Sequence, residues 1–299
     1  MKILAAPLQG YTDRFFRNAH FAEIGGTEEY YSPFLRMESG SIREKELSDV
    51  EKEKNLSPGT VPQILVKSGA ELAFFAEELG NKGKWKRIDL NFGCPYVPVV
   101  KRGYGAGILE DRKAVEEVLK ETEKFPAVAF SVKCRLPEAD ENILHILQDY
   151  KLKHIILHPR KASQEYKGTP DREAFYRFLA YGGKNPLGYN GDINTLADVP
   201  ENTDILMLGR GLLRDPLLAR KIAGEVFSPE EENSLYKKFH SSYAAFLLEG
   251  TKKAEEKLPK LKTFWEYFLP QKDKKIRKKL SKCRTFGEYK ELVEELFSM

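Results

Sequence analysis

Short apolar runs alternate along residues 1–228 with longer stretches in which apolar residues recur three or four positions apart. The short runs predict about eight strands, at 3–7, 28–32, 61–66, 87–91, 127–133, 154–158, 186–190 and 204–209. The longer stretches predict helices at 13–24, 70–79, 111–124, 142–151, 172–180 and 216–226. The predicted strands are apolar through their middles, as parallel strands buried on both faces are. This alternation predicts an α/β fold of the (β/α)8 TIM barrel class.

The strand pattern ends near Ser228, and the remainder of the chain has only helical periodicity. Pro229 followed by three glutamates, 230–232, is typical of a helix start, where proline fits the first turn and acidic side chains favour the N-terminus. Helices are predicted at 231–248, 252–267, 272–282 and 286–297. We therefore expect two domains, a barrel over 1–228 and an all-helical domain over 229–299.

The composition is typical of a folded globular protein, with 299 residues, 41% hydrophobic and 31% charged. The three cysteines are odd in number and form no C-x-x-C pair, so they indicate neither a disulfide framework nor a metal site. The N-terminus lacks a signal-peptide core, and no apolar run reaches membrane-spanning length. These features lead us to expect a cytoplasmic protein without a membrane partner, and no protein partner can be inferred from them.

Positive charge is concentrated near the C-terminus. Residues 257–284 contain eleven Lys and Arg against two acidic residues, a net charge of +9, whereas the rest of the chain carries −5. Such a segment is either a nucleic-acid-binding surface or a solvated lysine-rich helix face.

Mostly polar residues stand at the predicted carboxyl ends of the strands, where TIM barrels carry their catalytic and binding side chains. They are Pro7, Leu8, Gln9, Asn91, Cys94, Lys133, Arg135, His158, Arg160, Asn190, Asp192 and Arg210, with Gln63 inside the third strand. Gly191 and the run 209–211 follow strands seven and eight, where barrels often bind phosphate. A plain strand-to-helix turn is the alternative interpretation of these glycines.

Cys94 lies between Gly93, which permits close backbone approach, and Pro95, which fixes the next turn. A free thiol is mostly protonated at neutral pH, so Cys94 could act as a general acid. A buried structural cysteine is the alternative. For His158 the alternative is a core histidine whose hydrogen bonds are satisfied.

Together these strings resemble the tRNA-dihydrouridine synthase family. The resemblance spans the barrel and, more loosely, the basic helical tail. Its most specific element is N-x-G-C-P followed seven residues later by G-Y-G-A. The matching strings are A-P-L-Q-G-Y-T-D from Ala6, L-N-F-G-C-P from Leu90, G-Y-G-A-G-I-L from Gly103, V-K-C-R from Val132, N-G-D-I from Asn190 and L-G-R-G from Leu208.

The resemblance implies a flavoenzyme that reduces the C5–C6 bond of a tRNA uridine. NADPH would reduce FMN, which would deliver hydride to C6, and Cys94 would give a proton to C5. The implied FMN-binding residues are Pro7, Leu8, Gln9, Gln63, Lys133, His158, Asn190, Gly191, Asp192, Gly209 and Arg210. Asn91 and Arg135 would position the uridine, and Lys274, Lys275, Lys278 and Lys279 would contact tRNA.

The chain departs from the family pattern after strand six. There His158-Pro159-Arg160-Lys161 replaces the usual H-G-R-T, so a backbone donor is lost and the turn is stiffened. Two other functions stay open from the sequence: an FMN barrel oxidoreductase acting on a small molecule, and a non-catalytic tRNA-binding protein on the same scaffold. The target uridine and the choice between NADPH and NADH also stay open.

Overall fold

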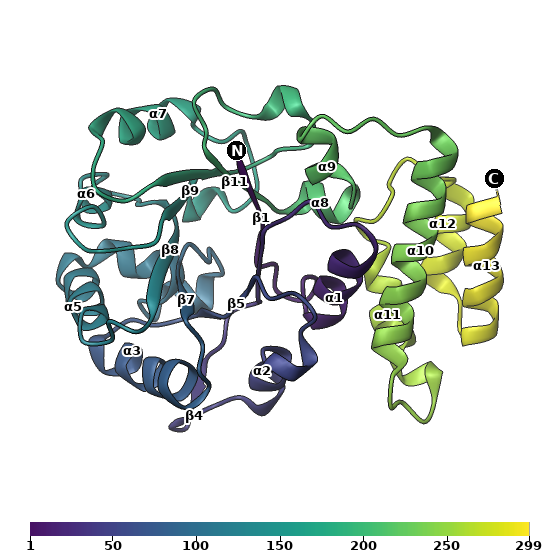
Figure 1. Cartoon of the computed structure of the whole chain (residues 1–299), viewed down its shortest axis with the longest axis horizontal. Coiled ribbons are helices and arrows are strands. Elements are labelled where there is room, and N and C mark those ends of the chain that lie inside the picture. Colours follow the sequence, from purple (N-terminus) through teal and green to yellow (C-terminus); the bar gives the residue numbers. More distant parts are fainter. Residues whose placement is uncertain (299) are drawn as a thin grey trace.

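The computed structural model describes residues 1–298 and contains a closed parallel β-barrel (Figure 1). The strands pair in the order β5-β2-β1-β11-β10-β9-β8-β7-β6, and every pairing is parallel. Their bounds are β1 Lys2–Ala5, β2 Glu29–Tyr31, β5 Thr60–Val61, β6 Gln63–Ile64, β7 Arg87–Phe92, β8 Ala129–Leu136, β9 Ile155–Lys161, β10 Leu187–Asn190 and β11 Ile205–Leu208.

The barrel closes through a strand that Pro62 interrupts. β5 and β6 stand at opposite ends of the pairing order, yet they are halves of one strand, separated by Pro62 alone. Proline has no backbone N–H to donate to a ladder, but its carbonyl accepts the Asp89 N–H at 2.9 Å. The eight predicted strands are therefore all present, and the TIM barrel is confirmed.

Helices follow the strands and cover the barrel. They are α1 Arg14–Glu23, α2 Glu44–Asp49, α3 Gly69–Phe75, α4 Val97–Val100, α5 Arg112–Thr122, α6 Ile143–Ile146, α7 Arg172–Tyr181, α8 Arg210–Arg214 and α9 Leu218–Ile222. A short hairpin, β3 Met37–Glu38 and β4 Ser41–Ile42, lies between β2 and α2.

Two predicted helices of the barrel are much shorter than expected, and in the C-terminal part the predicted helix 252–267 is α-helical only in α11, Leu258–Phe264. The stretch 142–151 forms only the single turn α6. The Asn185 side-chain amide donates to the Leu147 and Tyr150 carbonyls, each at 2.8 Å, in place of the backbone N–H groups of a continuing helix. The stretch 216–226 forms only α9, which ends before Gly224 with φ of +97°. Glycine adopts this backbone conformation without steric cost, and it commonly ends a helix.

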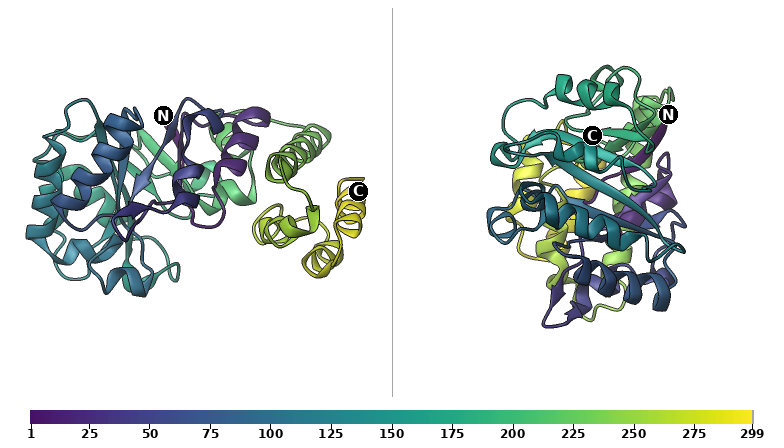
Figure 2. Two further views of the ribbon diagram at one scale, coloured as in Figure 1. Left: turned by 90° about the horizontal axis from the view of Figure 1, so that it is seen from below. Right: turned by 90° about the vertical axis from the view of Figure 1, so that its left-hand side faces the viewer.

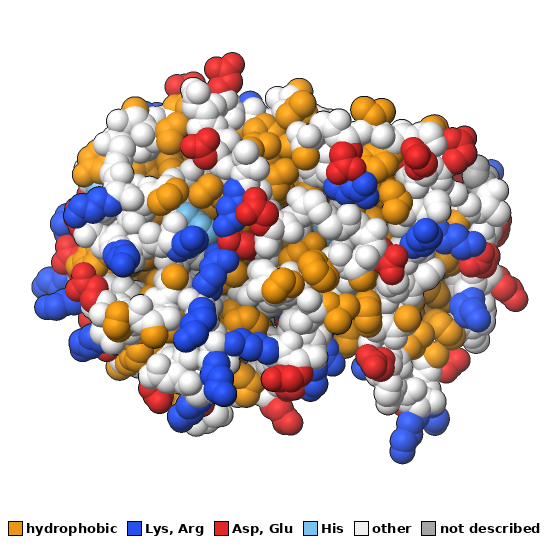
Figure 3. Space-filling view, in the orientation of Figure 1, with side chains coloured by type: hydrophobic (Ala, Val, Ile, Leu, Met, Phe, Trp, Pro, Cys, Tyr) orange, Lys and Arg blue, Asp and Glu red, His pale blue; other side chains and the backbone are white. Residues whose placement is uncertain are grey.

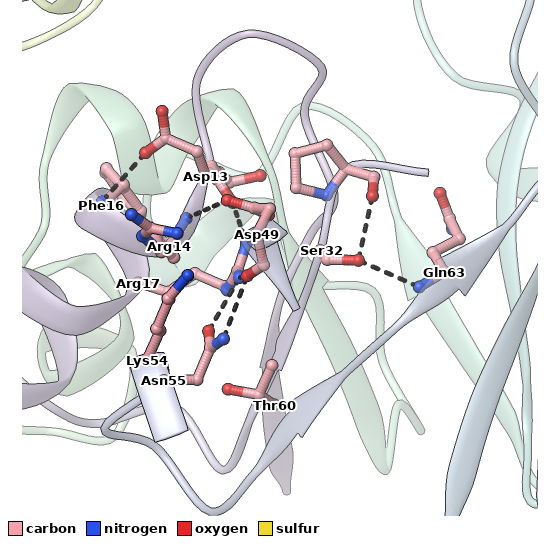
Figure 4. Close-up of polar contacts among 12 residues, drawn as sticks. Asp13, Arg14, Phe16, Arg17, Ser32, Asp49, Lys54, Asn55, Thr60 and Gln63 are labelled. Atoms are coloured by element: carbon pink, nitrogen blue, oxygen red, sulfur yellow. Dashed lines mark hydrogen bonds and ion pairs between the residues drawn. The ribbon is translucent and has the colours of Figure 1, made fainter. Parts of the chain in front are cut away.

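Helix α1 anchors the long segment between β2 and β5. The fully buried Arg17 donates to the carboxylate and carbonyl of Asp49 and to the Asn55 side chain at 2.6–2.9 Å (Figure 4). Arg14 adds a backbone N–H to the Asp49 carboxylate at 2.7 Å. The first turn of the first barrel helix thus fixes the segment that connects β2 to β5.

The C-terminal domain is all-helical and lies at one end of the barrel (Figure 2, left). It contains α10 Pro229–Leu248, α11 Leu258–Phe264, α12 Lys274–Lys282 and α13 Phe286–Ser298. Ser228 and Glu231 cap the start of α10 reciprocally, with the Ser228 N–H donating to the Glu231 carboxylate at 2.7 Å.

This helical domain shares its apolar core with the barrel. Phe16 of α1 packs edge-on against Phe239 of α10 with ring centroids 5.5 Å apart. Polar contacts flank this core, including Lys260 with Asp13 at 2.8 Å. Over residues 1–298, no helix has both the length and the apolar character needed to cross a membrane.

Candidate active site

A cavity of about 360 Å³ opens at the carboxyl ends of the barrel strands. All the predicted FMN-binding residues except Gln63 line it, and so do Asn91, Cys94 and Arg135. Strands of one parallel barrel end on the same face, so residues distant in sequence converge there. The strand-end pattern therefore predicted which side chains gather, although their individual roles stay predictions.

The loop that carries Cys94 is held by two sequence motifs. The Asn91 Oδ1 atom accepts the backbone N–H groups of Gly93 at 3.1 Å and Cys94 at 2.9 Å. The Ala106 N–H donates to the Cys94 carbonyl at 3.1 Å. N-x-G-C-P and G-Y-G-A thus contact each other directly, which explains why both occur together.

Gln63 lies beneath the cavity instead of lining it. Its amide accepts from Asn91 Nδ2 and donates to the Asp89 carboxylate, both at 2.7 Å. Its backbone N–H donates to the Ser32 hydroxyl at 3.1 Å (Figure 4). Gln63 therefore orients Asn91, and its predicted contact with FMN stays a prediction.

Asp89 ends this hydrogen-bond network inside the barrel. Its carboxylate also accepts from Ser131 at 2.5 Å. Burial raises the pKa of Asp89 to about 6, although the hydrogen bonds from Ser131 and Gln63 oppose this rise. The ionised carboxylate accepts both bonds, so it fixes the Gln63 amide with its nitrogen toward Asp89 and its oxygen toward Asn91.

Lys133 of β8 is a cation without a partner. It lines the cavity, and within residues 1–298 its ammonium makes neither an ion pair nor a hydrogen bond. Burial and, secondarily, the neighbouring Arg135 lower the pKa of Lys133 to about 8. An incompletely solvated cation of this kind gains from a ligand that carries an acceptor or a negative charge.

The Cys94 thiol is partly buried in the same cavity. Burial raises its pKa, and the Tyr96 backbone N–H and the charge of Arg135 offset only part of that rise. Cys94 is thus a protonated thiol at neutral pH.

Asp192 is the carboxylate in a strongly cationic part of the cavity. It pairs with Arg160 and, at 2.6 Å, with Arg210. Burial alone would raise the pKa of Asp192, but these two arginines outweigh burial and lower it. The Arg210 guanidinium also lies 4.5 Å from the centre of the Tyr166 ring, so Arg210 is already engaged within the protein.

Comparison with known proteins identifies the family of this chain. The family model described as dihydrouridine synthase (Dus) matches residues 3–299. The chain belongs to the dihydrouridine synthase family. A tRNA-dihydrouridine(16) synthase of Aquipseudomonas alcaligenes is 30% identical over 78% of each chain. One from Ralstonia nicotianae is 26% identical over 75% of this chain and 73% of its own. A probable tRNA-dihydrouridine synthase of Helicobacter pylori is 28% identical over 72% and 67%.

In this dihydrouridine synthase family member, some cavity residues were not anticipated. Phe34 follows β2, and Asn194 and Arg214 follow β10 and β11. Tyr166 reaches the cavity from the loop after β9, where Arg135 and Arg210 lie 5.2 and 4.5 Å from its ring centre. Phe34, Tyr166 and Asn194 lie in loops without periodicity, and Arg214 ends the short helix α8. Only the position of an aromatic residue among turn residues could have indicated Tyr166.

The basic segment 257–284 divides into structural and free cations. Lys260 pairs with Asp13, Lys262 donates to the Cys283 carbonyl at 3.0 Å, and Lys272 donates to Asn233 at 2.7 Å. Arg277 donates to the carbonyls of Trp265, Phe268 and Leu269 at the end of α11. By contrast, the four predicted tRNA contacts are exposed on α12, outside the lining of the cavity: Lys274, Lys275, Lys278 and Lys279.

Proposed function

We propose that this chain is a flavin-dependent tRNA-dihydrouridine synthase that uses FMN and NADPH. The observation that carries the proposal is one cavity lined by the protonated thiol of Cys94 and by the Lys133 ammonium, which has no partner within residues 1–298, in a chain of the dihydrouridine synthase family. Family membership supports the reaction, and the cavity supports the division of roles among its residues.

The cavity residues fit an anionic, planar cofactor. Among residues 1–298, four cations line it, Lys133, Arg135, Arg210 and Arg214, against one carboxylate, that of Asp192. Gly191 and Gly209 border the same cavity without side chains, so their backbone can approach a phosphate closely. We infer that Gly209 and Arg210 hold the phosphate of FMN, while Lys133 and His158 face its ring.

Bound FMN, reduced by NADPH, would supply the hydride that adds to uracil C6. In our proposal Lys133 stabilises negative charge near the cofactor ring, since a preorganised cation lowers the cost of charge that develops in a buried site. Asn91 and Arg135 position the uracil edge. Cys94 then donates its proton to C5, which a thiol with a raised pKa is protonated to do.

A uridine inside folded tRNA must leave its stack to reach this cavity. We propose that the barrel, residues 1–228, binds FMN and carries out the reaction, and that the helical domain, 229–299, helps bind the tRNA. The protein would act in the cytoplasm. On the face in Figure 3, Lys and Arg side chains form a band over the barrel, so the barrel presents cations as well as the exposed lysines of α12. The relatives from Aquipseudomonas and Ralstonia are named for position 16, so U16 is the first position to examine.

The test is made on the purified full chain and in cells. We expect a yellow protein that releases FMN and not FAD, because the sequence has no G-x-G-x-x-G dinucleotide motif. NADPH oxidation should be stimulated by tRNA from a strain that lacks this gene, and dihydrouridine should return when the gene is restored. Flavin without tRNA stimulation would favour a small-molecule oxidoreductase, and tRNA binding without flavin would favour a non-catalytic protein.

A further inference from the structure

His158 lies at the carboxyl end of β9 with one ring nitrogen against an arginine. It is 6% exposed and lines the cavity. Its Nε2 atom lies 3.1 Å from Nη1 of Arg160, which is itself fully buried. Within residues 1–298, the Nδ1 atom of His158 has no hydrogen-bond partner. This atom is not fully buried, so a ligand in the cavity can reach it.

The chemistry of the two groups fixes the direction of this hydrogen bond. A guanidinium has only donors, so Nε2 of His158 must accept with its lone pair. Burial and the charges of Lys133, Arg135, Arg160 and Arg210 lower the pKa of His158 well below its usual range, which keeps the ring neutral. A neutral imidazole carries one proton, and that proton must then be on Nδ1.

The alternative ring orientation is unfavourable. A half-turn of the imidazole would place Cε1–H against the Arg160 guanidinium and lose the hydrogen bond. The ring also packs closely against Gly191, where an added Cβ would lie 3.0 Å from Cδ2 of His158. Proton position and ring orientation are therefore set together.

Arg160 is held in place by the strand itself. β8 and β9 pair Arg135 with His158 and then Leu136 with Lys161, so Pro159 and Arg160 form a bulge between the two pairs. A bulge tolerates proline because its N–H is not needed there. From the bulge, Arg160 Nη2 donates to the Gly168 carbonyl at 2.6 Å and pairs with Asp192.

We propose that Arg160 is a positioning residue that holds His158 as the neutral tautomer with its proton on Nδ1, so that this ring offers the cavity a permanent N–H donor. The proposal rests on the proposed function for the identity of the acceptor, an oxygen or nitrogen atom of the flavin ring. It assigns His158 to binding alone and leaves proton transfer to uracil with Cys94.

The tautomer can be read by long-range 15N–1H correlation spectra of the full chain labelled with 15N-histidine. We expect an Nδ1–H pattern whose signals disappear in His158→Asn. His20 is an internal reference for the opposite pattern, because its Nε2 lies 2.9 Å from the Pro216 carbonyl and must carry the proton. An imidazolium or an Nε2–H pattern for His158 at neutral pH would overturn the proposal.

Variants at position 160 test the cause. In Arg160→Met the His158 ring should shift to the Nε2–H pattern or titrate near neutral pH, whereas Arg160→Lys, which keeps a donor, should preserve the Nδ1–H pattern. An unchanged His158 signal in a folded Arg160→Met protein would show that Arg160 does not set the tautomer. If that variant does not fold, the wild-type spectrum still decides the proton position.

A pair of His158 variants tests the consequence for the cavity. In His158→Asn the amide lies where Nδ1 lies, and in His158→Gln it lies where Nε2 lies. FMN affinity should fall by about tenfold in His158→Gln and by about threefold or less in His158→Asn, as expected for one neutral hydrogen bond. The reverse order would overturn the assignment. Failure of the wild-type chain to bind FMN would instead contradict the proposed function. The two failures can be distinguished, because the tautomer spectra are recorded without flavin.

Discussion

Gly105 closes directly against Cys94. A Cβ atom at residue 105 would lie 2.7 Å from the Cys94 carbonyl oxygen and 2.8 Å from its Cβ, and Gly105 has a φ of +60°. Position 105 therefore requires glycine for two reasons: its left-handed backbone conformation and its close contact with Cys94. Gly103, two residues earlier, has a φ of +77° but only a distant neighbour, the Lys67 side chain at 4.0 Å.

This difference gives a matched pair of variants. Gly103→Ala and Gly105→Ala should both lose about 1–2 kcal/mol of unfolding free energy from the left-handed backbone. Gly105→Ala should also displace Cys94, so uridine reduction should fall far more than in Gly103→Ala, while flavin reduction by NADPH is retained in both. Thermal unfolding and separate half-reaction rates measure this. Equal loss of uridine reduction in the two variants would show that only backbone strain matters.

Replacing Cys94 itself should separate the two half-reactions. Cys94→Ala should keep FMN binding and reduction by NADPH, because the thiol is needed only for proton transfer to the uracil. Uridine reduction should fall by about 100- to 10,000-fold, the usual contribution of a general acid. Stopped-flow measurement of each half-reaction checks this.

Cys283→Ala is the control for loss of a cysteine, since Cys283 is buried in the helical domain. It should leave both half-reaction rates unchanged. Parallel loss of both half-reactions in Cys94→Ala would assign Cys94 a structural role, and normal turnover would remove it from the mechanism.

Lys133 should make FMN binding pH-dependent. Its pKa in the free protein is lowered to about 8, so it is mostly charged at pH 7 and loses its charge as the pH rises past 8. A bound acceptor or anion would raise that pKa, so binding takes up a proton above pH 8 and affinity falls with rising pH, by at most about tenfold per pH unit.

Fluorescence titration of FMN between pH 7 and 10 measures this dependence. Lys133→Met should bind FMN more weakly at pH 7 and lose the decline that begins near pH 8. The control Lys67→Met removes a lysine outside the cavity lining and should keep the wild-type profile. A decline that persists unchanged in Lys133→Met would assign it to another group.

The sequence predicted the site well where barrel topology alone brings residues together. Strand ends converge in any closed parallel barrel, so Cys94, Lys133 and His158 could be placed in one cavity from strand positions. The hydrogen bonds that orient the side chains around the cavity could not be predicted. Nothing in the spacing of Gln63 indicates that both ends of its amide are used by Asp89 and Asn91.

Helix lengths and charge roles were harder to predict because tertiary contacts decide them. The Asn185 side chain ends α6 from a distant loop, and no local pattern near residue 146 encodes that contact. In the same way, the +9 charge of residues 257–284 was correctly counted but includes structural cations. Arg277, for example, donates its hydrogen bonds to backbone carbonyls that follow α11.

Helix α12 has one buried and one free face. Ile276 and Leu280 are buried against the domain core, while the lysines between them are exposed. Lysines that neutralise phosphates release counterions, so each contact adds about 0.9 log units or less to the slope of affinity against salt. A solvated helix face would add nothing to that slope.

We therefore predict that replacing four α12 lysines by Gln weakens tRNA binding and flattens its salt dependence, without changing the flavin spectrum or flavin reduction by NADPH. The four are Lys274, Lys275, Lys278 and Lys279. The control carries the same charge change on other exposed lysines of the barrel: Lys113, Lys120, Lys151 and Lys153. Dissociation constants for tRNA at several salt concentrations measure both variants. If the α12 variant is folded and matches the control in affinity and slope, its lysines are only a solvated face. The tRNA would then have to be held by the cations of the barrel, beside the cavity that contains Cys94.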